Sequence, residues 1–317
     1  MPLISICIPA YRQPAFLQRC LQSIADQRCH DVEIIITDDS PGAELQAVAN
    51  PFSAMFSIAY HHNATPLGSP ANWTAALAKA TGAYVMLLHH DDWLHRADTL
   101  DLLVDALEAN PTADAAFAAY KYVDQESNSE RQIVLNMEMW QKLQKAPELL
   151  FASNLIGPPS VLLMRRQNLV TYDPALKWLV DLEGYYRYLK AGHQLVYVPQ
   201  CLVSIGESNH QVTATAKYNP QVQVYEHLYC LQKHGTPILR RWQTYDAYWR
   251  MLRNAGVRSE AQLNEFAAPL HPSAIVAYMV NWQRHIPPFI LKIGLYSKQF
   301  MFLSYLNALR QKAFWNN

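Results

Sequence analysis

The chain lacks most of the signatures that identify common classes of protein. Only 16% of its 317 residues are charged, and 26 basic residues balance 26 acidic ones, so the composition gives no reason to expect nucleic-acid binding. The five cysteines form no CxxC pair and show no zinc-ligand spacing. Neither GxGxxG nor GxxxxGK[ST] occurs, which argues against a dinucleotide-dependent dehydrogenase and a P-loop enzyme.

Targeting and membrane-spanning patterns are also missing. The opening segment MPLISICIPAY has no charged region and no cleavage-site pattern, so we expect no secretory signal. No run of about 18 apolar residues predicts a spanning helix. A cysteine pattern of this kind fits a reducing compartment best, so we predict a cytoplasmic protein, with the cytoplasmic face of the membrane as the alternative location.

Acidic residues are absent after Glu265, although the whole chain is neutral. Residues 266–317 therefore carry +5, from Arg284, Lys292, Lys298, Arg310 and Lys312, and the rest of the chain carries −5. The segment 287–315 mixes these basic residues with aliphatic and aromatic ones. One interpretation is an interfacial helix in peripheral contact with the inner membrane. The other is a helix packed on the catalytic domain or on a second subunit.

Short apolar runs alternate with helical patterns in the first 120 residues. The predicted strands are 3–9, 32–38, 56–62 and 83–88, and the predicted helices are 14–27, 43–50, 69–82 and 97–111. Ser69 and Pro70 are predicted as the N-cap and first residue of the third helix. This alternation indicates an α/β fold with a mostly parallel sheet flanked by helices.

The pattern changes along the rest of the chain. Further strands are predicted at 113–124, 159–166 and 193–199, with helices at 137–152 and 174–192. Only helical patterns follow residue 216. We therefore expect a catalytic domain over 1–215 and a helical C-terminal appendage over 216–317.

Three of the predicted strands end in polar residues. The ends read Pro9-Ala10-Tyr11-Arg12, Asp38-Asp39-Ser40 and His89-His90-Asp91-Asp92. Ligands of open α/β sheets bind beyond the carboxyl ends of parallel strands, so these residues are expected to line one cleft. Two acidic pairs in one cleft favour a bound cation, and oxygen ligands favour Mg²⁺ or Mn²⁺.

Four stretches together resemble one family. They are SICIPAYRQPAFLQRCLQSI, EIIITDDS, NATPLGSPANWTAALAKATGAYVMLLHHDDWL and LVDLEGYYRYLKAG. In this order they resemble the successive motifs of family 2 inverting glycosyltransferases, which have the GT-A fold and use nucleotide sugars. The resemblance covers about residues 3–212.

The resemblance implies a nucleotide-sugar site at the strand ends. The residues assigned to this site would lie beside the nucleotide. They are Pro9, Tyr11, Arg12, Asp38, Asp39, Asn72, His89 and His90. His89-His90-Asp91 occupies the family's Asp-x-Asp position, so His89 replaces the first carboxylate, while His90 has no defined contact. An acidic pair after a strand is also common in turns and helix caps, and Asn72 also suits a purely structural hydrogen-bonding role.

The resemblance also implies metal ligands and a catalytic base. Asp91 is the first candidate for binding Mg²⁺ or Mn²⁺, and Asp92 is the second. His210 in a later polar loop is the third, with Glu207 and His193 as nearby alternatives. Asp181 lies six residues before an arginine, as the family's base does, although Val180 replaces the usual glutamate. Glu183 lies about 200° further around the same helix, so the two carboxylates cannot both face the cleft well. Glu183 is therefore an alternative base and not a partner of Asp181.

The resemblance implies an inverting, metal-dependent glycosyltransferase. It would move a sugar from a nucleotide sugar to a hydroxyl of a glycan or glycolipid. A UDP-sugar is the first candidate for the donor, and dTDP- and GDP-sugars are the alternatives. The expected setting is cell-surface polysaccharide or lipopolysaccharide synthesis. A nucleotidyltransferase acting on sugar phosphates is a second hypothesis, which the glycine-free PAYRQP segment disfavours. A non-catalytic binding protein with this fold is a third, and the histidine at position 89 favours it.

Overall fold

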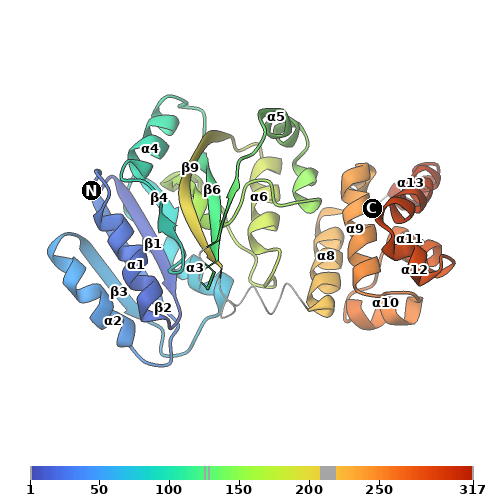
Figure 1. Cartoon of the computed structure of the whole chain (residues 1–317), viewed down its shortest axis with the longest axis horizontal. Helices are drawn as coiled ribbons and strands as arrows, with labels where there is room; N and C mark the ends of the chain where they lie inside the picture. Colours follow the sequence, from blue (N-terminus) through green and yellow to red (C-terminus); the bar gives the residue numbers. More distant parts are fainter. Residues whose placement is uncertain (1, 125, 128, 208–218, 316–317) are drawn as a thin grey trace. The chain divides into compact units, whose positions relative to one another are not determined.

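The structure is a computed structural model that describes residues 2–124, 126–127, 129–207 and 219–315. The described residues form two compact units. The first, the sheet unit, comprises 2–144, 155–175 and 184–207. The second, the helical unit, comprises 145–154, 176–183 and 219–315. Figure 1 shows the sheet with its flanking helices, and the helices of the second unit.

Nine strands of the described residues form one sheet. Its order is β3-β2-β1-β4-β8-β6-β9-β5, and β7 pairs with β6. The strands are β1 (Ile4–Ala10), β2 (Val32–Asp38), β3 (Ser57–His62), β4 (Tyr84–Leu87), β5 (Trp93–Leu94), β6 (Ala115–Asp124), β7 (Glu130–Ile133), β8 (Leu162–Arg165) and β9 (Leu195–Glu207). The first four are parallel, whereas β8 is antiparallel to both β4 and β6. The α/β fold is confirmed, with a mixed second half.

The register of the parallel strands brings their carboxyl ends together. Ala10 at the end of β1 lies opposite Asp38, and Asp38 lies opposite His62. Cys7 of β1 pairs with Leu87, the last residue of β4. All seven residues of β1 are buried, as expected for a parallel strand covered on both faces. The polar segments after β1, β2 and β4 therefore begin at one edge of the sheet.

The helices of the sheet unit lie close to the predicted ranges. They are α1 (Pro14–Ala25), α2 (Glu44–Ala49), α3 (Ser69–Leu77), α4 (Thr99–Glu108) and α5 (Met137–Lys145). The prediction that Ser69 caps α3 is wrong, because Ser69 is already helical and Gly68 is the N-cap. Gly68 has a φ of 81°, which favours glycine, and its amide donates to Asp39 at 2.9 Å.

Several elements are shorter than the sequence predicted. The helix expected over 137–152 ends at Lys145, and Pro147–Phe151 forms a separate 3₁₀ helix. The strand expected from residue 159 begins at Leu162, because Pro159–Val161 forms a 3₁₀ turn. The helix expected over 174–192 is α6 (Val180–Lys190). The backbone N–H groups of residues 177, 178 and 179 donate instead to the buried Glu226 carboxylate, at 2.7–2.9 Å. A side chain of another helix therefore fixes where α6 begins.

The second unit is helical, as its sequence predicted. Its helices are α8 (Pro220–His234), α9 (Trp242–Asn254), α10 (Glu260–Ala267), α11 (Ala274–Arg284), α12 (Pro288–Lys292) and α13 (Gly294–Leu309). Tyr245, Tyr248 and Trp249 of α9 are fully buried in its core. Among the described residues, no helix combines the length and apolar character needed to cross a membrane.

Candidate functional site

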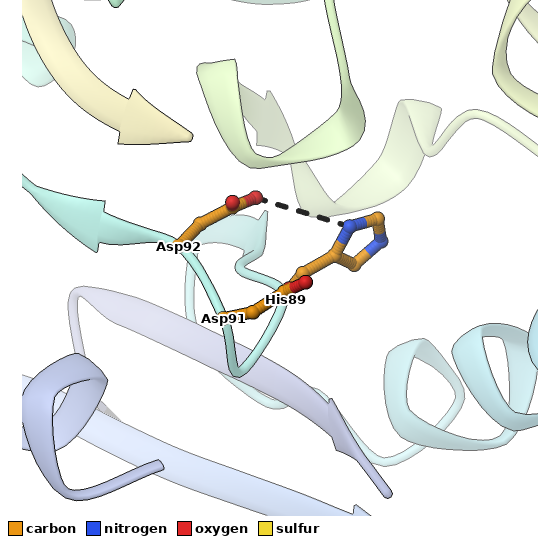
Figure 2. Close-up of side chains that lie close together, drawn as sticks. All are labelled: His89, Asp91 and Asp92. Atoms are coloured by element: carbon orange, nitrogen blue, oxygen red, sulfur yellow. Dashed lines mark ion pairs between the residues drawn. The ribbon is translucent and has the colours of Figure 1, made fainter. Parts of the chain in front are cut away.

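The turn between β4 and β5 gathers three groups that could hold a metal ion. One ligand atom from each of His89, Asp91 and Asp92 lies within 4.8 Å of the others. Figure 2 shows the Asp92 carboxylate directed toward the His89 ring, where Oδ2 lies 3.9 Å from Nδ1. The Asp92 amide donates to the carbonyl of His89 at 3.0 Å, which closes the turn. This tight turn brings the three side chains together.

Asp92 is held by two distant segments of the chain. Its side chain is buried, and Oδ2 accepts a hydrogen bond from Ser160 at 2.5 Å while Oδ1 accepts one from the Gly206 amide at 3.2 Å. Burial, together with the negative charge of Asp91, holds the pKa of Asp92 well above its usual range. A cation would stabilise the ionised pair, because it offsets both the burial and the repulsion. The donor set therefore fits a divalent metal ion.

Both histidines have a pKa below the usual value for this side chain. Burial lowers the pKa of His89 to about 4 and also lowers that of His90. Among the described residues, no side chain or backbone group hydrogen-bonds to the buried Nε2 atom of either ring. A neutral imidazole with an unbonded nitrogen can act as a metal ligand. In His89, the nitrogen that faces the Asp92 carboxylate is Nδ1.

His90 has a different environment from His89. Burial lowers the pKa of His90, and the negative charge of Asp91 and hydrogen bonding to the backbone of Pro9 and Tyr11 oppose this shift. The ring also lies 6.4 Å from that of Phe16 in α1. His90 therefore ties the turn after β4 to the segment after β1, a role that the sequence did not indicate.

The segment between β1 and α1 has an unusual backbone. Arg12 and Gln13 have φ values of 53° and 58°, a region that residues other than glycine rarely adopt. The Arg12 amide donates to Ser40 Oγ at 2.7 Å, which joins the ends of β1 and β2. The Arg12 guanidinium lies 5.0 Å from the centre of the exposed Tyr11 ring. Positive φ values of this kind occur often at functional sites.

The two aspartates after β2 hydrogen-bond within the protein. Asp38 accepts from the Ser40 amide at 2.8 Å and from the Tyr60 hydroxyl. Asp39 accepts from the amides of Leu67 and Gly68 and from the side chain of Asn63. Both carboxylates are buried. They therefore fix the loop that leads into α3.

Asn72 belongs to the same network. Its Nδ2 donates to the Thr37 carbonyl at 3.0 Å, and its Oδ1 accepts from Asn63 at 3.0 Å. The next residue, Trp73, packs on the ring of His89 at 4.7 Å between centroids. The start of α3 thus connects the loop after β2 to the cluster of His89, Asp91 and Asp92.

Some residues around the cluster carry no local sequence signal. Arg19 of α1 donates to the Asp91 carbonyl at 3.1 Å, and its guanidinium lies 3.8 Å from the centre of the Trp93 ring. Ser160 and Gly206 reach Asp92 from segments far along the chain.

A cavity of about 590 Å³ lies between α1 and residues 93–97, and none of the predicted site residues lines it. We therefore do not assign the predicted chemistry to that cavity.

The two candidate bases on α6 have different surroundings in the helical unit. Asp181 is partly exposed and accepts hydrogen bonds from Asn154 Nδ2 at 2.7 Å and from the Leu182 amide at 2.8 Å. Burial raises the pKa of Asp181 to about 6, although these hydrogen bonds oppose the shift. Glu183 is fully buried and lies 2.9 Å from both Lys233 Nζ and His234 Nε2. The third predicted metal ligand, His210, lies outside the described residues.

Comparisons with known proteins identify the class and then the family. A solved mannosyltransferase of Pyrobaculum calidifontis, in complex with GDP-Man and Mn²⁺, is 16% identical with a TM-score of 0.58, over 98% of this chain and 87% of that one. TarS of Staphylococcus aureus, in complex with UDP-GlcNAc, is 13% identical with a TM-score of 0.55, over 98% and 82%. The fold is therefore that of the GT-A glycosyltransferases. The model of glycosyl transferase family 2 matches residues 5–169, and the chain belongs to this family.

Curated relatives match a smaller part of the chain. A PGL/p-HBAD biosynthesis glycosyltransferase of Mycobacterium bovis is 35% identical over 100 residues, which are 31% of this chain and 39% of that protein. The chain spans about half the length, or less, of the first curated relatives that it matches.

Proposed function

We propose that the chain is an inverting, metal-dependent glycosyltransferase that moves a sugar from a nucleotide sugar to an acceptor hydroxyl. The observation that carries this proposal is the cluster of His89, Asp91 and Asp92 at the carboxyl end of a parallel strand in a family 2 chain. An imidazole and two carboxylates suit a divalent ion that contacts phosphate oxygens.

The donor would be bound at the ends of β1 and β2. Arg12 and Tyr11 are exposed beyond β1, so a guanidinium and an aromatic ring are available to a diphosphate and a nucleoside. Pro9 is a buried residue near the end of the same strand. Asp38, Asp39 and Asn72 hydrogen-bond within the protein, and we assign them to shaping the wall that borders the base.

His89, Asp91 and Asp92 would hold Mg²⁺ or Mn²⁺. When bound, the ion would supply positive charge opposite the diphosphate that leaves the sugar. Asp92 is fixed by Ser160 and Gly206, so its carboxylate is already positioned. His90 would keep the turn in register with the segment after β1.

Asp181 is the proposed general base. The acceptor hydroxyl oxygen attacks the anomeric carbon from the face opposite the diphosphate, the bond from that carbon to the diphosphate oxygen breaks, and the hydroxyl proton passes to the Asp181 carboxylate. A pKa of about 6 suits this role, because the carboxylate is ionised at neutral pH and is more basic than an ordinary aspartate. Glu183 is paired with two basic groups, so we assign it a structural role.

The donor, the acceptor and the setting are proposed from the family. The two solved neighbours hold UDP-GlcNAc and GDP-Man. For this chain we propose a UDP-sugar as the first candidate donor, with dTDP- and GDP-sugars as alternatives. A glycan or glycolipid hydroxyl in cell-surface polysaccharide or lipopolysaccharide synthesis remains the proposed acceptor. The mycobacterial relative named for PGL/p-HBAD biosynthesis is in keeping with such a setting.

Calorimetry with the Asp91→Ala variant tests the metal-dependent donor site. We expect the native chain to bind UDP, dTDP or GDP more tightly with Mn²⁺ than without it, and Asp91→Ala to lose this difference. The exposed Asp105 on α4 provides a matched control, and Asp105→Ala should bind like the native chain. If Asp91→Ala bound the nucleotide with unchanged affinity in Mn²⁺, the assignment of Asp91 would be wrong.

A further inference from the structure

The last long helix, α13, has an unusual distribution of side chains. Its buried positions hold Ser297, Met301, Ser304 and Ala308, which are mostly small or polar. Ser297 accepts a hydrogen bond from Trp249 Nε1 at 3.2 Å, and Ser304 lies 2.6 Å from the Tyr245 hydroxyl. Small side chains and hydrogen bonds therefore hold this helix against α9, with little burial of large apolar groups.

The large apolar side chains of α13 are exposed. Leu295 is 68% exposed, and the series continues with Phe302 at 45%, Leu306 at 42% and Leu309 at 41%. Spacings of seven, four and three residues place these four on one face of a helix. Leu303 on α13 is 53% exposed, and Phe289 and Ile293, on and just after α12, are 68% and 45% exposed. We call these seven residues the apolar stripe.

The charged side chains of the segment that carries the stripe are all basic. Lys292, Lys298, Arg310 and Lys312 are exposed, and no acidic residue occurs anywhere after Glu265. Lys298 Nζ lies 5.3 Å from the ring of Trp242, which is 39% exposed. Exposed apolar, aromatic and basic side chains in one segment are typical of helices that lie in the interface of an anionic membrane.

The charge and the length of α13 indicate which kind of partner covers its exposed face. A symmetric contact between two copies would bring the same basic groups together from both sides, which is unfavourable. The 16 residues of α13 extend about 24 Å, which is less than the hydrocarbon core of a bilayer. The helix is therefore suited to lying along a membrane surface.

We propose that α12 and α13 dock on the surface of an anionic phospholipid membrane. The apolar stripe enters the interface, and the surrounding lysines and arginines contact the lipid phosphates. The proposal does not depend on sugar transfer, because it rests on side chains outside the metal-ligand cluster and the candidate base.

Flotation of the full chain with lipid vesicles tests the proposal without a nucleotide sugar. We expect binding to vesicles of phosphatidylcholine mixed with phosphatidylglycerol, weaker binding to phosphatidylcholine alone, and release at high salt. Replacing Lys292 and Lys298 by glutamine should lower partitioning by roughly fivefold for each lysine.

A second variant tests the stripe itself. Phe302→Ser combined with Leu306→Ser should lower vesicle binding by at least about tenfold, because exposed apolar groups no longer enter the interface. The control replaces Met55 and Val134 by serine, since both are 55% exposed on the sheet unit, and it should bind like the native chain. Circular dichroism confirms that each variant is folded.

Three results would overturn the proposal. The first is native-like vesicle binding by the folded stripe variant. The second is no binding of the native chain to anionic vesicles. The third is a native dimer in sedimentation that the stripe variant converts to a monomer, without any lipid binding; the stripe would then be a protein interface.

Discussion

Two neighbouring aspartates have different roles at the scale of single residues. Asp92 is 2% exposed and accepts hydrogen bonds from Ser160 and Gly206, whereas Asp91 is partly exposed in the same turn. The greater exposure of Asp91 makes it the more accessible of the two to an incoming ion, and we therefore propose it as the main metal ligand. The hydrogen bonds of Asp92 give that residue a role in fixing the turn.

The proposed base provides a prediction at the same scale. Asp181→Asn should lower kcat by about 10²–10⁴-fold, because an amide does not accept the acceptor proton, while nucleotide affinity should change little. In the native chain, turnover should fall as the pH drops through about 6, where the carboxylate becomes protonated. Steady-state kinetics from pH 5 to 8 measure both effects.

The control for this prediction is the exposed Asp105, where Asp105→Asn should keep the native pH profile. Near-native turnover in Asp181→Asn would remove this residue from the mechanism. A low kcat that still showed the decline near pH 6 would assign that titration to another group.

At the scale of elements, the start of α6 depends on α8. Glu226 is buried and accepts three backbone hydrogen bonds, from residues 177, 178 and 179. Asp181 follows in the first turn of α6, so the glutamate also determines where the proposed base lies in the helical unit. This contact explains why the helix is shorter than its sequence pattern.

Glu226→Ala should therefore destabilise the protein by about 2–4 kcal/mol, because backbone donors would lose their buried acceptor. Glu226→Gln keeps one oxygen acceptor and should have a smaller effect. Urea unfolding followed by circular dichroism measures both variants. Equal stability of the alanine variant and the native chain would show that solvent or other groups can satisfy these donors.

At the scale of the whole molecule, the proposed donor site and metal ligands described here belong to one of the two compact units. A ligand that binds only the folded state stabilises it by mass action, by about 2.7 kcal/mol at 100 times its Kd. For a unit of this size the corresponding rise in Tm is about 5–10 °C.

A thermal-shift screen of UDP-, dTDP- and GDP-sugars should therefore identify the donor. We expect a rise in Tm for one nucleotide class, larger with Mn²⁺ than without it, and no such difference in Asp91→Ala. Equal shifts in the presence and absence of Mn²⁺ would contradict metal-dependent binding.

The sequence by itself determined the parts that depend on local pattern. Apolar runs such as VEIIITD became buried strands, and parallel pairing then required the ends of β1, β2 and β4 to meet at one edge. The placing of His89, Asp91 and Asp92 in one turn followed in the same way, because the turn is only a few residues long. The C-terminal helices were also evident from periodicity.

Only the tertiary structure decided which groups touch across long separations in the chain. Asp92 meets Ser160 across 68 residues and Gly206 across 114, and Glu183 is paired with Lys233 and His234. The antiparallel direction of β8 and the outward-facing leucines of α13 were also decided only by the tertiary structure. Local sequence encodes periodicity and propensity, whereas burial and pairing depend on which surfaces of distant segments pack together.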